Sequence, residues 1–204
     1  LGLSTETAES VKNENLKKDN FKTLTYSHLF YNNSKPIFKN KEFRKNLTLL
    51  LQKVASSAAT KTQFLEFSPY YFPKGILPRN YYREISFKDV TFEKFSKKWK
   101  NELKKQSLNI VLLEDVYPRT FIDELVNGFK SFNINIKVEA INIGFNKRLK
   151  DKSYDVISGL YMGNFPDPDG FIEPIIQNEE YSYGVMPIEA KLDEQWVVID
   201  PINN

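Results

Sequence analysis

The 204-residue sequence contains no cysteine, one histidine and two methionines. The absence of cysteine excludes disulfides, thiolate metal sites and a cysteine nucleophile, and it is compatible with export without arguing for it. With His28 as the only histidine, a zinc site is not expected. A serine triad would have to recruit His28 without any nucleophile-elbow motif, so enzyme chemistry has no support from the sequence.

Long apolar runs and glycine-rich phosphate loops are also missing. No apolar run approaches the roughly 20 residues that a membrane helix requires, and we expect no direct membrane span. The eight glycines are isolated, and none opens a helix directly after a strand, so a phosphate-binding loop is not predicted.

The charge balance argues against nucleic-acid binding. The formal net charge is only +3, from 29 basic and 26 acidic residues, and both signs are spread along the chain. The nearest candidate for a basic stripe, residues 94–105, is interpreted as the solvated face of a helix. With 41% hydrophobic and 27% charged residues, the composition is that of a folded globular domain.

The chain divides into three parts by pattern. We predict a polar, lysine-rich arm or helix at 1–20, an α/β lobe at 21–177 and an extended return segment at 178–204. In the lobe, alternation from Phe21 through Phe30 predicts a half-buried strand carrying His28. After a turn, Asn40 is suited to cap a helix that reaches Val54.

The middle of the chain alternates between helix and strand patterns. Apolar spacing predicts helices at 91–106, 118–132 and 145–149, and apolar runs predict strands at 108–113, 134–141 and 154–162. This order indicates a parallel sheet with right-handed crossovers. The predicted fold class is therefore α/β, a mixed sheet with a parallel βαβαβ core flanked by helices.

Two loops are candidates for ligand contact. Ligands of open parallel sheets lie outside the carboxyl ends of the strands, and the loop after 154–162 contains Asp167 and Asp169. On chemistry alone we favour a capping role for these two carboxylates, and without further oxygen ligands they predict neither a metal nor a cofactor. The proline-rich loop 68–79 is flanked by aromatic residues that would either line a groove or seal the loop onto the core: Tyr70, Tyr71, Phe72, Tyr81 and Tyr82.

The order of these features resembles a known family. Residues 154–171, YDVISGLYMGNFPDPDGF, resemble the ligand-side strand and turn of family 5 extracellular solute-binding proteins, the oligopeptide-type receptors of bacterial ABC importers. Residues 30–51 resemble the segment in which a strand ending in Asn leads to a helix, with Arg44 at the arginine of that helix. Residues 74–78 and 108–138 resemble its Gly and Pro loop and its strand, helix and strand.

The resemblance implies a two-lobed α/β clamp, of which this chain matches mainly the distal lobe. Either the chain is a truncated or atypical member, or residues are missing near 178–181. The implied function is noncovalent binding of a peptide or other small molecule for an ABC importer permease, in the periplasm or outside the cell in association with the membrane. The implied ligand-binding residues are Tyr161, Gly163, Asn164, Phe165 and Asp167.

Asn164 departs from the pattern of the peptide-binding relatives. An Asp at that place pairs with the free amino group of the ligand, and an amide supplies no charge for a buried ammonium. Two alternatives therefore stay open: a sensory or protein-interaction domain of the same fold without transport, and, ranked last, a catalytic domain using Asp167, Asp169 or His28.

Overall fold

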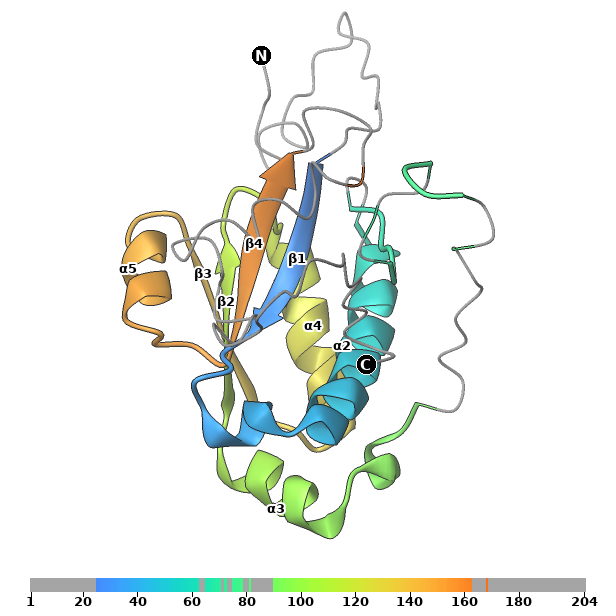
Figure 1. Cartoon of the computed structure of the whole chain (residues 1–204), viewed down its shortest axis with the longest axis vertical. Helices are drawn as coiled ribbons and strands as arrows, with labels where there is room; N and C mark the ends of the chain where they lie inside the picture. Colours follow the sequence, from blue (N-terminus) through green and yellow to red (C-terminus); the bar gives the residue numbers. More distant parts are fainter. Residues whose placement is uncertain are drawn as a thin grey trace, which may run out of the picture.

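The central strand of the fold is apolar on both faces. The computed structural model describes residues 25–62, 65–70, 72, 75–78, 81, 90–162 and 168. In it β2 (Leu108–Leu113) is parallel to β3 (Ile136–Ile141) on one side and to β4 (Val156–Met162) on the other. β1 (Thr25–Tyr31) pairs antiparallel with β4, which gives the order β1-β4-β2-β3 (Figure 1). The predicted mixed sheet with a parallel βαβαβ core is confirmed.

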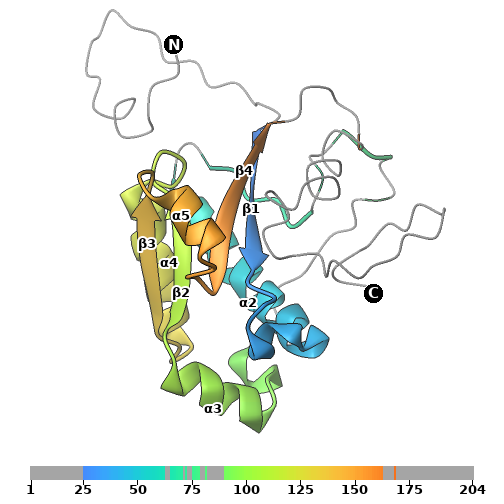
Figure 2. The same cartoon turned by 60° about the vertical axis from the view of Figure 1, so that its left-hand side comes forward.

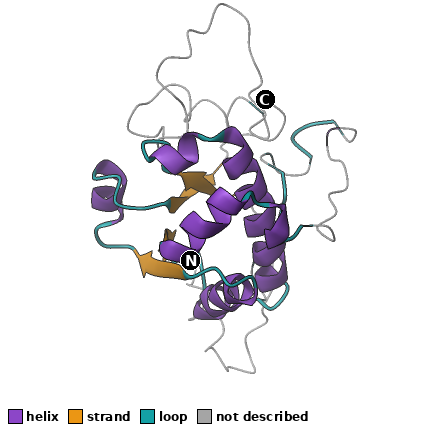
Figure 3. Ribbon diagram, turned by 90° about the horizontal axis from the view of Figure 1, so that it is seen from below, coloured by secondary structure: helices purple, strands orange, loops and turns teal. Residues whose placement is uncertain are grey.

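Helices cover both faces of this sheet (Figures 2 and 3). One face packs against α2 (Lys41–Ala59) and α4 (Arg119–Ser131), which share a single apolar cluster with alternate residues of the strands. The short α5 (Phe145–Lys150) lies over the other face, where Phe145 packs with Phe30, Val111 and Ile157. The alternation in β1 follows from this arrangement, because its successive side chains meet different layers.

The helix predicted after Asn40 begins as expected but is longer. The Asn40 side chain accepts a hydrogen bond from the backbone N–H of Phe43 at 2.9 Å, which caps α2. The predicted end at Val54 is wrong, because α2 continues to Ala59 and buries Ala55, Ala58 and Ala59 as well. Small side chains give a weak apolar signal, and they are the ones that pack closest to the neighbouring helix.

The single helix predicted at 91–106 is also wrong in one respect. The segment forms a 3-10 turn, η3 (Phe92–Lys94), and then α3 (Lys97–Lys105). Between them Phe95 is extended, and the Ser96 side chain accepts from the N–H of Trp99 at 3.5 Å as the cap of α3. The predicted apolar residues are nevertheless buried on both sides of this interruption of the helix: Phe92, Phe95 and Leu103.

Another 3-10 turn, η1 (Pro36–Lys39), connects β1 to α2. The predicted arginine of the following helix holds this turn, because Arg44 Nη1 donates to the Phe38 carbonyl oxygen at 2.5 Å. Within the predicted loop 68–79, the described residues are irregular apart from one bridge at Leu77. The predicted arm at 1–20 and return segment at 178–204 lie outside the described residues, so the three-part division stays a prediction.

α2 and α4 approach each other closely at Gly128. A Cβ added to Gly128 would lie 2.4 Å from Val54 Cγ1, closer than two carbon atoms can approach without displacement. The glycine thus sets the separation of the two helices over the sheet, although glycine is a poor helix former.

We expect Gly128→Ala to destabilise the fold by about 1–3 kcal/mol through overpacking, although the same change in an exposed helix would stabilise by about 1 kcal/mol. Urea unfolding of the purified chain measures the difference. Asn127→Ala, at the exposed neighbouring position of α4, is the control and should change stability little. Adding Val54→Ala should relieve part of the Gly128→Ala cost, and a more stable Gly128→Ala protein would contradict the close contact.

Candidate functional site

The carboxyl ends of β2, β3 and β4 lie at one edge of the sheet, because these strands are parallel. In Figures 1 and 2 this is the upper edge, toward which the arrowhead of β4 points. β1 runs the opposite way and begins there, with Thr25 paired to Met162 and Tyr26 to Tyr161. We call it the carboxyl edge; it is where an open parallel sheet binds ligands.

Of the five predicted ligand-binding residues, only Tyr161 lies among the described residues. Its backbone occupies the next-to-last position of β4, opposite Tyr26. Gly163, Asn164, Phe165 and Asp167 follow directly along the chain and lie outside the described residues, as does Asp169. β4 thus ends where the predicted site begins, and the assignment of these side chains to a site stays a prediction.

Buried hydrogen bonds fix the strand ends at the carboxyl edge. Ser158 on β4 is fully buried, and its Oγ accepts from the backbone N–H of Leu113, the last residue of β2, at 2.9 Å. The Leu113 carbonyl in turn accepts from the N–H groups of Val116 and Tyr117, which makes a tight turn into α4. The strands are held in register up to the last residues before the loops.

Tyr117 connects this turn to β1. Its hydroxyl donates to Ser27 Oγ at 2.6 Å, and its ring lies 5.2 Å from that of Phe121. Burial raises the pKa of Tyr117 to about 12, while the hydrogen bond with Ser27 acts in the opposite direction. The hydroxyl therefore stays neutral at physiological pH and serves as a fixed donor between α4 and the sheet.

The loops after β2 and β3 bring further polar and apolar groups to the carboxyl edge. Glu114 and Asp115 are exposed directly after β2, and the Asp115 N–H donates to Asn142 Oδ1 at 3.3 Å. Next to Asn142, Ile143 is 97% exposed, and Leu160 on β4 is 43% exposed. These groups were not predicted from the sequence, although each lies directly after or within a predicted strand, which is a usable signal.

His28 has a position typical of a structural residue. It pairs with Gly159 in the β1–β4 ladder, and its ring lies between those of Tyr26 and Phe30, 5.9 Å from each. Within the described residues no group of three His, Cys, Asp or Glu residues is placed to hold a metal ion. The groups brought together at the carboxyl edge are therefore suited to hydrogen bonding and apolar contact with a ligand.

Neither the family models nor the curated proteins searched contain a match to this sequence. Solved structures do match. HbpA2 from Haemophilus parasuis matches with a TM-score of 0.57 and 17% identity over 83% of this chain and 35% of its own. OppA from Haemophilus influenzae, in complex with RPPGFSPFR, matches with a TM-score of 0.53 and 18% identity over 79% of this chain and 34% of its own. DppA from Helicobacter pylori, in complex with the peptide STSA, matches with a TM-score of 0.51 and 19% identity over 84% of this chain and 34% of its own.

The chain has the fold of one lobe of a periplasmic binding protein. It spans about a third of the length of the matched structures, as the resemblance to a single lobe predicted. Of these three structures, DppA carries the name of a periplasmic binding protein. Among the described residues, no helix is both long and apolar enough to cross a membrane.

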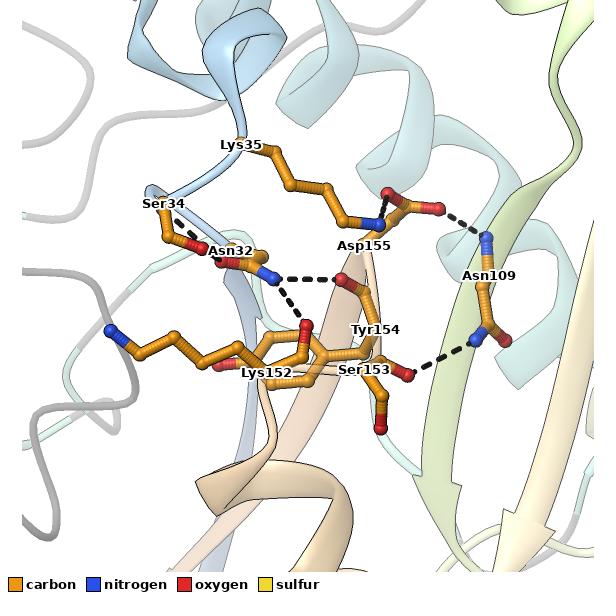
Figure 4. Close-up of polar contacts among 8 residues, drawn as sticks. All are labelled: Asn32, Ser34, Lys35, Asn109, Lys152, Ser153, Tyr154 and Asp155. Atoms are coloured by element: carbon orange, nitrogen blue, oxygen red, sulfur yellow. Dashed lines mark hydrogen bonds and ion pairs between the residues drawn. The ribbon is translucent and has the colours of Figure 1, made fainter.

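The opposite, amino edge of the lobe is held by a buried amide (Figure 4). Asn32 directly follows β1 and is 1% exposed. Its Nδ2 donates to the carbonyl oxygens of Lys152 at 2.8 Å and Tyr154 at 3.0 Å, and its Oδ1 accepts from the backbone N–H of Ser34 at 3.1 Å. One side chain thus joins the end of β1 to the residues that lead into β4, and it supports Lys152 at a φ of 50°.

Asp155 extends this connection to β2 and η1. Its two carboxylate oxygens accept from the Lys35 ammonium at 2.6 Å and from the backbone N–H of Asn109 at 2.7 Å. The Asn109 carbonyl accepts from the Asp155 N–H at 2.8 Å. Asp155 lies in the stretch 154–171 that resembles the family's ligand-side strand and turn, and its contacts hold three segments together.

We expect Asn32→Ala to lower the free energy of unfolding by about 3 kcal/mol, because the buried Tyr154 carbonyl and the partly buried Lys152 carbonyl lose their donor and a cavity remains. Urea unfolding measures this effect. Ser34→Ala is the matched control, since it removes one hydroxyl contact with Asn32 Oδ1 and leaves both bonds to the carbonyls. Equal losses in the two variants would show that the buried amide is not the main contributor.

Proposed function

We propose that this protein is a solute-binding component of a bacterial ABC import system and that the lobe binds a peptide noncovalently. The observation that carries the proposal is the match of about four fifths of the chain to a single lobe of periplasmic binding proteins, two of them in complex with peptides. The likeness establishes the fold alone, so the peptide, the permease and the location outside the cytoplasm belong to the proposal.

The geometry of the carboxyl edge supports a binding role. Exposed Ile143 and Leu160 offer apolar contact, and exposed Glu114 and Asp115 offer hydrogen-bond acceptors and negative charge. A peptide presents the same mixture of apolar side chains, backbone amides and a terminal ammonium. Because one edge covers only one side of such a ligand, a second lobe supplies the opposite wall, and closure of the two buries the peptide.

In this proposal the ligand contacts come from the end of β4 and the loop after it. Tyr161, Gly163, Asn164, Phe165 and Asp167 face the peptide, with the tyrosine ring as a stacking surface. Asn164 donates and accepts hydrogen bonds without a charge. In this proposal the protein acts by binding and release and not as an enzyme, since the sequence offers no nucleophile-elbow motif and no glycine-rich cofactor loop.

Deleting the gene should lower the uptake of labelled peptides, because an importer without its binding component cannot capture solute. The measurement is uptake of a labelled peptide mixture by the deletion strain, compared with the parent strain and with a strain in which the gene is restored. Uptake of an amino acid by an independent route is the control. Unchanged uptake of every peptide, together with capture of a protein partner from the native cell, would favour the interaction domain.

Asn164→Asp should strengthen the binding of peptides with a free amino terminus by about tenfold or more, because a carboxylate pairs with a buried ammonium where an amide does not. Calorimetry on the protein as the cell makes it measures the effect. N-acetylated versions of the same peptides are the control and should bind no more tightly to the variant. No effect on any peptide would remove Asn164 from the proposed site.

A further inference from the structure

The end of the lobe opposite the carboxyl edge carries a concentration of lysines. α3 lies across the lower end of the molecule in Figures 1 and 2 and contains five lysines and one glutamate in its nine residues. The ring of Phe43 at the start of α2 lies 5.3 Å from that of Trp99 on α3, so the lysines at the start of α2 belong to the same end.

We call the exposed lysines of these two helices the basic surface. Its members are Lys41 and Lys45 on α2 and Lys97, Lys98, Lys104 and Lys105 on α3. The acidic residues of the same segments are Glu42, Glu93 and Glu102, and within the described part of the chain none of the six lysines forms an ion pair. The positive charge at this end therefore exceeds what a whole-chain net charge of +3 suggests.

Three of these lysines stand where they weaken the helices that carry them. Lys41 is the first residue of α2, and Lys97 and Lys98 are the first two of α3, which has no acidic residue in its first turn. The amino end of a helix carries partial positive charge and favours Asp or Glu there. Lys98 has a cation–π contact with the ring of Trp99, but a cation that opposes the stability of its own helix end still points to a functional requirement.

We propose that the basic surface docks on the anionic phospholipid surface of a membrane. A cluster of four to eight Lys or Arg residues is the pattern that recognises anionic lipid headgroups. Lysines act as point charges that need no fixed partner geometry, which suits a fluid array of phosphates. Arg44, next to Lys45 on α2, does not add to this surface in the same way, because its guanidinium donates to the Phe38 carbonyl.

A nucleic acid or an acidic protein fits these observations less well. Single-stranded nucleic acids are held by exposed aromatic rings among basic residues, and Trp99 packs against Phe43 while the Lys98 ammonium lies 4.6 Å from the centre of its ring. The inference rests on the proposed function, since a component of an importer works beside a membrane. Docked in this way, the lobe turns its carboxyl edge away from the lipid and leaves it open to the ligand.

Vesicle flotation tests the docking with the protein as the cell makes it and with no peptide present. We expect binding to vesicles of phosphatidylcholine mixed with phosphatidylglycerol and none to vesicles of phosphatidylcholine alone. Binding should be lost at about 1 M salt, where the Debye length falls to about 3 Å. Absence of binding to the anionic vesicles at low salt would overturn the proposal.

A variant with Lys41→Gln, Lys97→Gln and Lys98→Gln should lower the vesicle partition coefficient at least about tenfold, since each lysine near an anionic surface strengthens binding about fivefold. These substitutions should not unfold the protein, because they remove positive charges from helix amino ends, where positive charge is unfavourable. The control, Lys61→Gln, Lys147→Gln and Lys150→Gln, changes the net charge equally and should bind as the parent does. Equal loss in both variants would overturn the basic surface as the docking site.

Two more outcomes separate this inference from the proposed function. Binding of DNA or of an acidic peptide as tightly as anionic vesicles would overturn a lipid as the occupant. Vesicle binding that depends on the basic surface, in a protein that binds no peptide and supports no uptake, would sustain the docking and reject the importer role. Peptide uptake by a protein that does not bind vesicles would support the importer role and reject the docking.

Discussion

The buried amide of Asn32 is the constraint on which the arrangement of the sheet depends. β1 is an antiparallel strand added to the edge of a parallel sheet, and the pattern of its side chains alone permits more than one register. By donating to the carbonyls of Lys152 and Tyr154, Asn32 fixes where β1 ends relative to the start of β4. A shift of one residue would break these bonds and turn Phe30 from the layer under α5 to the layer under α2.

The same constraint acts at the far end of the strands. Once the pairing of Tyr31 with Val156 is fixed, the ladder sets Tyr26 opposite Tyr161, and Ser27 meets the hydroxyl of Tyr117. The carboxyl edge is thus positioned by contacts formed at the amino edge, seven residues away along β1. A ligand site at the end of β4 depends on this rigidity, because loops that bind ligands require fixed supports.

Local patterns were sufficient to predict the parallel core. Apolar runs and helical spacing identified β2, α4, β3 and α5 because each element buries one continuous set of large side chains. The break at Phe95 and Ser96 escaped prediction, since the apolar spacing continues through a 3-10 turn and a cap. The role of Asn32 also escaped, because its partners lie 120 and 122 residues away in the sequence, and long-range pairing leaves no local signal.

The carboxyl edge could be predicted from the parallel strands, but not all of the groups that lie at it. An open parallel sheet places its ligands at the carboxyl ends, which led directly from β4 to Tyr161. Glu114, Asp115 and Ile143 follow other strands, and they join the same edge only because β2 and β3 lie beside β4 in the sheet. The order of strands in a sheet is a global property, so a reading along the chain found one of the three loops.

The near-balanced composition of the chain does not show how unevenly the fold distributes its charges. Acidic and basic residues nearly balance over the chain, and a lysine-rich segment inside such a sequence is ordinarily a solvated helix face. Folding places Glu114 and Asp115 at the carboxyl edge and brings α3 against the start of α2 at the other end. Among the described residues, the end that carries α3 then presents mainly positive charge, and a field of this kind orients a molecule at a charged surface more than it stabilises its fold.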